Sequence, residues 1–181
     1  MPNVLVPLAE GFEEIEALAI VDVLRRAGIA VVVAGLCPGL VTSARNVSVL
    51  PDTTIDTISA DGFDMIILPG GQPGTDNLDN APRIHQLLAE FQTAGKLIGA
   101  ICAAPIILAA AELLHGKHAT SYPTYSSKLN GAVYEDRSVV SDGNIMTSQG
   151  PGTAISFALA IVSRLLGEQA SDTVRKAMIV I

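Results

Sequence analysis

The feature that most constrains the fold is an alternation of short apolar runs with longer segments of helical periodicity. Residues 3–9, 29–36, 64–71 and 97–101 are apolar runs of strand length, and residues 13–28 carry the first helical pattern. Strands that alternate with helices are joined by crossovers and form a parallel sheet with helices on both faces. The sequence therefore predicts an α/β fold, a three-layer α/β/α sandwich with a mostly parallel sheet.

The rest of the chain carries further turn and helix signals. They predict a hairpin within residues 41–52, one long helix over 76–95, a hairpin turn at Asp142-Gly143, a helix over 148–167 and a short last helix. The 181 residues are 49% hydrophobic, which suits one core. We therefore expect a single domain over residues 1–181.

The net charge and the cysteine content limit the kinds of partner and compartment that we expect for this protein. Eighteen acidic residues against eleven basic ones give a net charge of −7, so nucleic acid and anionic membranes are poor partners. The start lacks the basic segment of a signal peptide, and the apolar stretch from Leu97 to Ala111 is too short to span a bilayer. The two cysteines, Cys37 and Cys102, form no disulfide framework and no zinc pattern. We expect a cytoplasmic protein that uses no metal.

Cys102 stands where the apolar run 97–101 gives way to an Ala-rich helical segment. A sharp turn from strand to helix exposes its residue at the sheet edge, and the amides at a helix start favour a thiolate. Cys102 is therefore the candidate nucleophile. The alternative is a small buried apolar residue, which is the simplest interpretation of Cys37 at the end of the second strand.

Glu16 lies on the apolar face of the first predicted helix, four residues before Ile20. A carboxyl buried beside a thiolate has a raised pKa and can hold and donate a proton. The alternative is a solvated first-turn carboxylate, an interpretation that suits Glu14. Glu13, one turn before Glu16, is a weaker candidate for the same site.

Backbone donors are expected from the glycines that end the run 64–71. Gly70 and Gly71 allow a ligand to approach the main chain closely. The carboxyl ends of parallel strands meet at one sheet edge, so the N–H groups of Gly71 and Ala103 could form an oxyanion hole.

The motifs AEGFEEIE, DxxxLPGG, AICAAP and TSxGPGT, in this order, resemble the ThiJ/PfpI superfamily and within it the DJ-one, or protein deglycase, branch, as a bacterial-type member. The resemblance covers essentially the whole chain. It implies a flavodoxin-like homodimer without metal or organic cofactor. It also implies that Cys102 is the reactive cysteine and Glu16 its protonated partner, with Gly71 and Ala103 as backbone donors. Arg45 matches an arginine near the dimer interface and the site.

One departure from the family pattern is clear. Tyr122 occupies the place of a family histidine and cannot act as a base near neutral pH, because tyrosine has an ordinary pKa of about 10. The histidines His85, His115 and His118 are expected at surface or capping positions. A Cys-His pair is therefore absent at that place, and Ala103 after the cysteine argues against a peptidase.

The resemblance implies a glyoxalase or deglycase, in the hydro-lyase or hydrolase class. Its substrates would be methylglyoxal, glyoxal or early glycation adducts. A second interpretation is a redox sensor or stress chaperone that responds to oxidation of Cys102. Both interpretations use the same residues, and turnover separates them.

Overall fold

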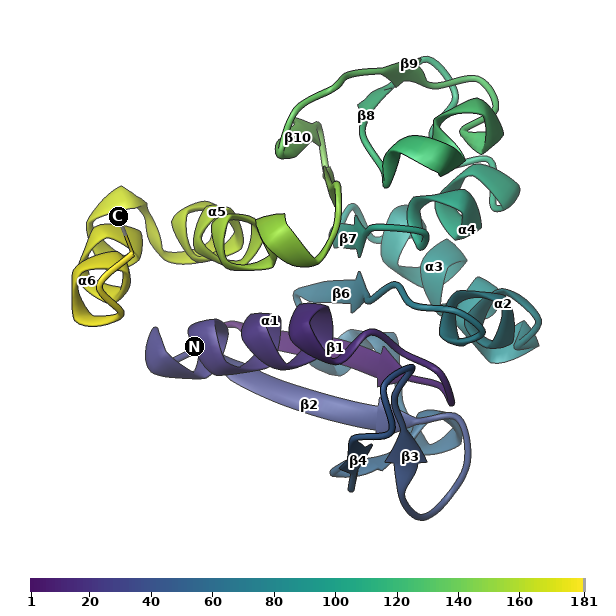
Figure 1. Ribbon diagram of the computed structural model, residues 1–181, viewed down its shortest axis with the longest axis horizontal. Helices are drawn as coiled ribbons and strands as arrows, with labels where there is room; N and C mark the ends of the chain where they lie inside the picture. The colour runs from purple at the N-terminus through teal and green to yellow at the C-terminus, as the bar shows by residue number, and fades with distance from the viewer. Residues whose placement is uncertain (181) are drawn as a thin grey trace.

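A seven-stranded sheet crosses the centre of the molecule in the order β10-β11-β7-β6-β1-β2-β5 (Figure 1). The computed structural model describes residues 1–180. Only β10 pairs antiparallel with its neighbour, β11, whereas the other neighbouring strands pair parallel. The predicted flavodoxin-like α/β fold with a mostly parallel sheet is therefore confirmed.

The sheet strands are β1 (Asn3–Leu8), β2 (Ala30–Gly35), β5 (Thr53–Thr54), β6 (Met65–Leu68), β7 (Leu97–Ile101), β10 (Val139–Asp142) and β11 (Ile145–Ser148). Two small separate sheets pair β3 (Val41–Thr42) with β4 (Ser48–Val49) and β8 (His118–Ala119) with β9 (Val133–Tyr134). The helices are α1 (Glu14–Arg26), α2 (Gly74–Asp79), α3 (Pro82–Thr93), α4 (Pro105–Ala110), α5 (Ala154–Leu166) and α6 (Glu168–Ala177). Short 3₁₀ helices lie at Ile55–Thr57, Ala60–Gly62, Pro123–Lys128 and Pro151–Thr153. Both predicted hairpins are present, as β3-β4 and β10-β11.

Two apolar layers cover the two faces of the sheet. Side chains alternate along β1, so Val4 and Val6 pack in the layer that contains α1 and α5, whereas Leu5 packs with α3 and α4. Figure 1 shows α1 and α5 side by side on one face of the sheet. Because both faces are covered, the central strands are apolar throughout, as the sequence analysis assumed.

The single helix expected over residues 76–95 is wrong, because the chain forms two helices there. α2 ends at Asp79, and α3 begins at Pro82 after Ala81 in an extended conformation. Proline has no N–H to donate, and its ring disfavours a helical conformation in the residue before it. Pro82 therefore starts a new helix at its first position instead of continuing the old one.

The helix expected over residues 148–167 begins later than predicted, at Ala154. Residues 145–148 form β11, and Pro151–Thr153 form a 3₁₀ turn between this strand and α5. The 13 residues of α5 fall short of the roughly 20 needed to cross a bilayer. Within residues 1–180, the structure contains no helix with the length and apolar character of a membrane span.

Candidate active site

Cys102 forms a strained elbow between β7 and α4. Its φ of 65° lies in the left-handed region, which a residue with a Cβ adopts only at a cost. The Cys102 N–H donates to the Ser148 carbonyl at 2.9 Å, and its carbonyl accepts from the Tyr122 N–H at 2.8 Å. These two bonds from separate segments hold the turn, and they leave the thiol partly exposed at the carboxyl edge of the sheet.

Glu16 is fully buried at the start of α1, among apolar neighbours on the same helix face. Its Oε2 accepts the Gly70 N–H at 2.8 Å. Its Oε1 is also buried and makes no well-aligned hydrogen bond, although the Cys102 thiol lies close enough to affect the titration of the carboxyl. A protonated carboxyl would satisfy Oε1 by donating its O–H to the sulfur.

The environment of Glu16 shifts its titration toward neutral pH. Burial raises its pKa from the usual 4.5 to about 7, against the lowering effect of the hydrogen bonds with Cys102 and Gly70. The negative charge of Glu13 raises the pKa further. The carboxyl can therefore take and release a proton near neutral pH, which is the property a general acid and base requires.

The thiol differs from the expectation of a thiolate favoured by a helix start. Burial raises the pKa of Cys102, and the charge of Glu16 and its hydrogen bond raise it further. The backbone N–H groups of Ala103 and Gly71 lower the pKa, but they do not outweigh burial. Because the contribution of Glu16 depends on an ionised carboxylate, the two groups titrate together, and a thiolate forms most easily while Glu16 keeps its proton.

The two glycines after β6 have different tasks. Gly71, with φ of 95°, directs its N–H toward the sulfur of Cys102, and so does Ala103. Gly70 instead gives its N–H to Glu16. A Cβ on Gly70 would lie 2.7 Å from both Cys102 Cβ and Glu16 Oε2, so only glycine fits between these side chains. The N–H groups of Gly71 and Ala103 are thus the backbone donors at the sulfur.

Glu13 and Arg45 lie around this centre without touching the thiol. Glu13 caps α1, because its Oε2 accepts the Glu16 N–H at 2.8 Å. Arg45 is exposed in the hairpin, and its guanidinium donates to the carbonyl of Ala44. The hairpin is fixed beside the loop before α1 by the Ala44 N–H, which donates to the Phe12 carbonyl at 2.8 Å. Within one chain, Arg45 therefore lies outside the centre.

Tyr122 and Gly150 form a wall beside the thiol. A Cβ on Gly150 would lie 3.3 Å from the ring of Tyr122 and 4.0 Å from Cys102 Sγ. Neither Gly150 nor Ser148, which accepts the Cys102 N–H, was found by sequence reasoning. The available signal was their place at and just after the carboxyl end of β11, which pairs parallel with β7, since these strand ends meet at the same edge.

The centre contains no metal-binding cluster. Across residues 1–180, no three His, Cys, Asp or Glu side chains come together in an arrangement that could hold a metal ion. Both cysteines are free, and Cys37 is exposed. At the centre, the chain supplies a thiol, a carboxyl and two backbone amides.

The order of the motifs and the geometry of the centre agree with one known family. The sequence pattern of the DJ-1/PfpI family matches residues 2–164. The chain belongs to this family. The protein dj-1beta of Drosophila melanogaster is 44% identical over 181 residues, which cover 98% of this chain and 97% of the relative. The DJ-1/PfpI assignment thus agrees with the resemblance seen in the sequence.

Solved structures of DJ-1 proteins share the whole fold. The crystal structure of Drosophila melanogaster DJ-1beta has a TM-score of 0.96 and covers 99% of this chain and 98% of its own. An oxidized form of Toxoplasma gondii DJ-1 has a TM-score of 0.95 at 35% identity, with 99% and 98% covered. A Caenorhabditis elegans relative, 38% identical over 93% of this chain and 91% of its own, is named the glutathione-independent glyoxalase DJR-1.2.

Proposed function

We propose that this protein is a cofactor-independent glyoxalase or deglycase that uses Cys102 as its nucleophile. The observation that supports this function best is the buried Glu16 carboxyl beside the thiol, with a pKa of about 7. The name of the Caenorhabditis elegans relative points to the same reaction class. The substrates are methylglyoxal and glyoxal, or the early glycation adducts that such aldehydes form.

The reaction begins with addition of the Cys102 sulfur to the aldehyde carbon of methylglyoxal. The C–S bond forms as the carbonyl π electrons move to oxygen, giving a hemithioacetal. The N–H groups of Gly71 and Ala103, which point toward the sulfur, are placed to stabilise the oxyanion. Glu16 then gives its proton to this oxygen, since its carboxyl is the nearby group that titrates near neutral pH.

The second half of the reaction moves a proton within the bound substrate. The Glu16 carboxylate removes the proton from the former aldehyde carbon, and an enediolate forms. Glu16 returns this proton to the neighbouring carbon, and the hydroxyl proton on the former aldehyde carbon passes to the neighbouring oxygen, which leaves a thioester of a 2-hydroxy acid. Water hydrolyses the thioester and restores the thiol. The sum adds one water to methylglyoxal and gives lactate, without an external oxidant or reductant.

A turnover assay tests this proposal directly. Wild type, Cys102→Ser and Glu16→Gln are compared for conversion of methylglyoxal to lactate. We expect turnover by the wild type only, with Cys102→Ser inactive because a hydroxyl is a far weaker nucleophile than a thiolate. Turnover by Cys102→Ser at the wild-type rate would contradict the proposal.

A redox sensor or stress chaperone is the second candidate, and the donors around the thiol support it. The N–H groups of Gly71 and Ala103 and a protonated Glu16 could hold the oxygens of a sulfinate at Cys102. A related DJ-1 of Toxoplasma gondii has been crystallised in an oxidized form. If wild type fails to turn over dicarbonyls but changes partners after peroxide treatment, this function replaces the first.

We also propose that the chain forms a symmetric homodimer through α1 and the β3-β4 hairpin. Ile15 and Leu18 on α1 are 57% and 39% exposed, and Val47 and Leu50 on the hairpin are 43% and 70% exposed. Exposed apolar side chains grouped on neighbouring segments are typical of a surface that binds a second copy. Two free thiols suit a reducing compartment, so we place the dimer in the cytoplasm.

A further inference from the structure

Residues 118–122 form an extended segment, which we call the strap, between a polar network and the catalytic cysteine. Every second N–H of the strap donates to a different element. The His118 N–H donates to Asp142 Oδ2 at 2.8 Å, the Thr120 N–H to Thr147 Oγ1 at 2.9 Å, and the Tyr122 N–H to the Cys102 carbonyl at 2.8 Å. The strap is thus bound mainly through side chains at one end and through the cysteine elbow at the other.

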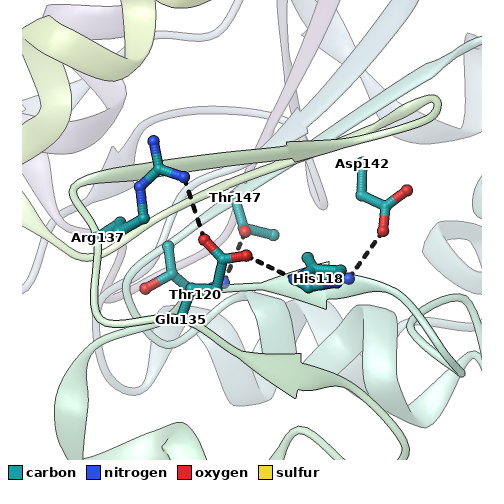
Figure 2. A network of polar contacts seen from close by, with 6 residues as sticks. All are labelled: His118, Thr120, Glu135, Arg137, Asp142 and Thr147. Atoms are coloured by element: carbon teal, nitrogen blue, oxygen red, sulfur yellow. Dashed lines mark hydrogen bonds and ion pairs between the residues drawn. The ribbon is translucent and has the colours of Figure 1, made fainter.

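The end of the strap at His118 is held by a side-chain hydrogen bond between His118 and Glu135. Figure 2 shows His118 between the carboxylates of Glu135 and Asp142, with Arg137 on the far side of Glu135. The distance from His118 Nδ1 to Glu135 Oε1 is 2.5 Å, and Arg137 Nη1 lies 3.2 Å from Glu135 Oε2. The Glu135 N–H also donates to the Ala119 carbonyl, so this residue binds the strap twice.

The Glu135 carboxylate keeps its negative charge in this pair. The hydrogen bond from His118 lowers the pKa of Glu135, and Arg137 also lowers it, so the carboxylate stays ionised. Histidine is the side chain that changes charge between about pH 5 and pH 8. The other charged groups that line the groove beside His118 are Arg137, Asp142, Arg164, Glu168 and Arg175.

The other end of the strap places the Tyr122 ring beside the thiol. Tyr122 is 44% exposed, and its ring lies against Gly150 beside Cys102. Because the ring lies beside the sulfur, a displacement of the strap that moves the ring would change how large a molecule can reach the thiol. The position of the strap therefore affects whether free dicarbonyls alone, or also glycated macromolecules, can reach Cys102.

We propose that His118 and Glu135 are positioning residues that keep the strap closed over Cys102 and so restrict the site to small dicarbonyls, a restriction that weakens as His118 loses its proton. The proposal rests on the assignment of Cys102 as the nucleophile under Proposed function. Its test is separate from the test of the proposed function, because closure of the strap can be measured without any turnover.

The experiment compares alkylation of Cys102 by iodoacetamide and by a maleimide that carries a large fluorophore, quantified on the Cys102 peptide. Both reagents attack the thiolate, so the ratio of their rates cancels the thiolate fraction and reports access alone. In the wild type, we expect the ratio of the maleimide rate to the iodoacetamide rate to rise about two- to fivefold from acidic to slightly alkaline pH. A change of this size corresponds to the free energy of an exposed ion pair.

Two variants and one control decide the outcome. In His118→Gln and in Glu135→Gln, the ratio should be high and independent of pH, because the ion pair is absent at every pH. His85→Gln is the control, because His85 pairs with Asp79 at 3.1 Å and does not contact the strap. A wild-type ratio that does not vary with pH, or one that rises equally in His118→Gln, would overturn the proposal. Methylglyoxal turnover, measured separately, tests the proposed function.

Discussion

Gly70 donates its backbone N–H to Oε2 of Glu16 over 2.8 Å, across 54 positions of the chain. The same glycine leaves the space in which Glu16 and Cys102 approach each other, because a Cβ there would lie 2.7 Å from atoms of both. One residue therefore positions the carboxyl by its amide and admits the thiol by lacking a side chain.

Gly70→Ala should reduce methylglyoxal turnover by about a hundredfold, since a displacement of about 1 Å at reacting groups has an effect of this order. The N–H donor remains in this variant, so the loss comes from the methyl group alone. Gly62→Ala is the matched control, because a Cβ at Gly62 meets nothing within 4 Å. Equal turnover by the two variants would show that the space at Gly70 is unimportant.

Glu16→Gln should reduce methylglyoxal turnover by about a hundredfold or more, the usual effect of losing a general acid and base. The amide keeps a donor for the sulfur but cannot exchange a proton. Peroxide should still convert Cys102 to its sulfinic form, which intact-mass spectra detect. If Glu16→Gln turns over methylglyoxal as fast as wild type, Glu16 moves no proton, and the sensor function becomes the better one.

Glu16→Gln should also lower the pKa of Cys102. Burial raises this pKa first, and the substitution leaves burial in place. It removes the carboxylate charge and replaces an acceptor by a donor, and both changes favour the thiolate. The rate of Cys102 alkylation by iodoacetamide is measured as a function of pH. The rise of this rate should therefore occur at a lower pH in Glu16→Gln than in the wild type. An unchanged profile would mean that the two groups are not coupled.

The sheet could be predicted from local pattern, and the proximity of the candidate residues followed from the predicted sheet. Apolar runs located the strands, and the rule that strand ends share an edge placed Gly71 beside Cys102. The direction of the thiol pKa could not be predicted, because it depends on how deeply Cys102 and Glu16 are buried together. The break at Pro82 was present in the sequence, but helical periodicity on both sides concealed it.

The contacts missed by the sequence analysis are between distant segments. Ser148 accepts the Cys102 N–H through its main chain, so no side-chain type could reveal it. Similarly, His118 acts on Cys102 only through the backbone of the strap. Sequence reasoning placed His118 at the surface, where it is, but the pairing with Glu135 depends on the parallel alignment of β8 and β9.

Static light scattering of the wild type at micromolar concentration should give twice the chain mass of 18.8 kDa. Leu18→Glu should shift the mass toward that of one chain, because it places charges in the proposed apolar interface. Val133→Glu is the control, a substitution at a 49% exposed position on β9, away from α1. A monomer mass for the wild type would contradict the proposed dimer.

The stability of the protein should fall as pH rises from about 5 to 8. The folded state raises the pKa of Glu16 from 4.5 to about 7, so between these values it binds more protons than the unfolded chain. The unfolding free energy then decreases with pH, and a rise of this size corresponds to about 3 kcal/mol, fully present below pH 4.5 and lost above pH 7.

Urea unfolding of wild type and Glu16→Gln at pH 5 and pH 8 measures this contribution, with other titrating groups common to both. The difference between the two proteins should change by an amount of that order, in the direction that favours the wild type at pH 5. Gln cannot ionise, so its contribution to the unfolding free energy does not depend on pH in this way. A difference that stays constant would mean that Glu16 titrates in the folded protein as it does in the unfolded chain, and the proton transfers assigned to it would then lack their basis.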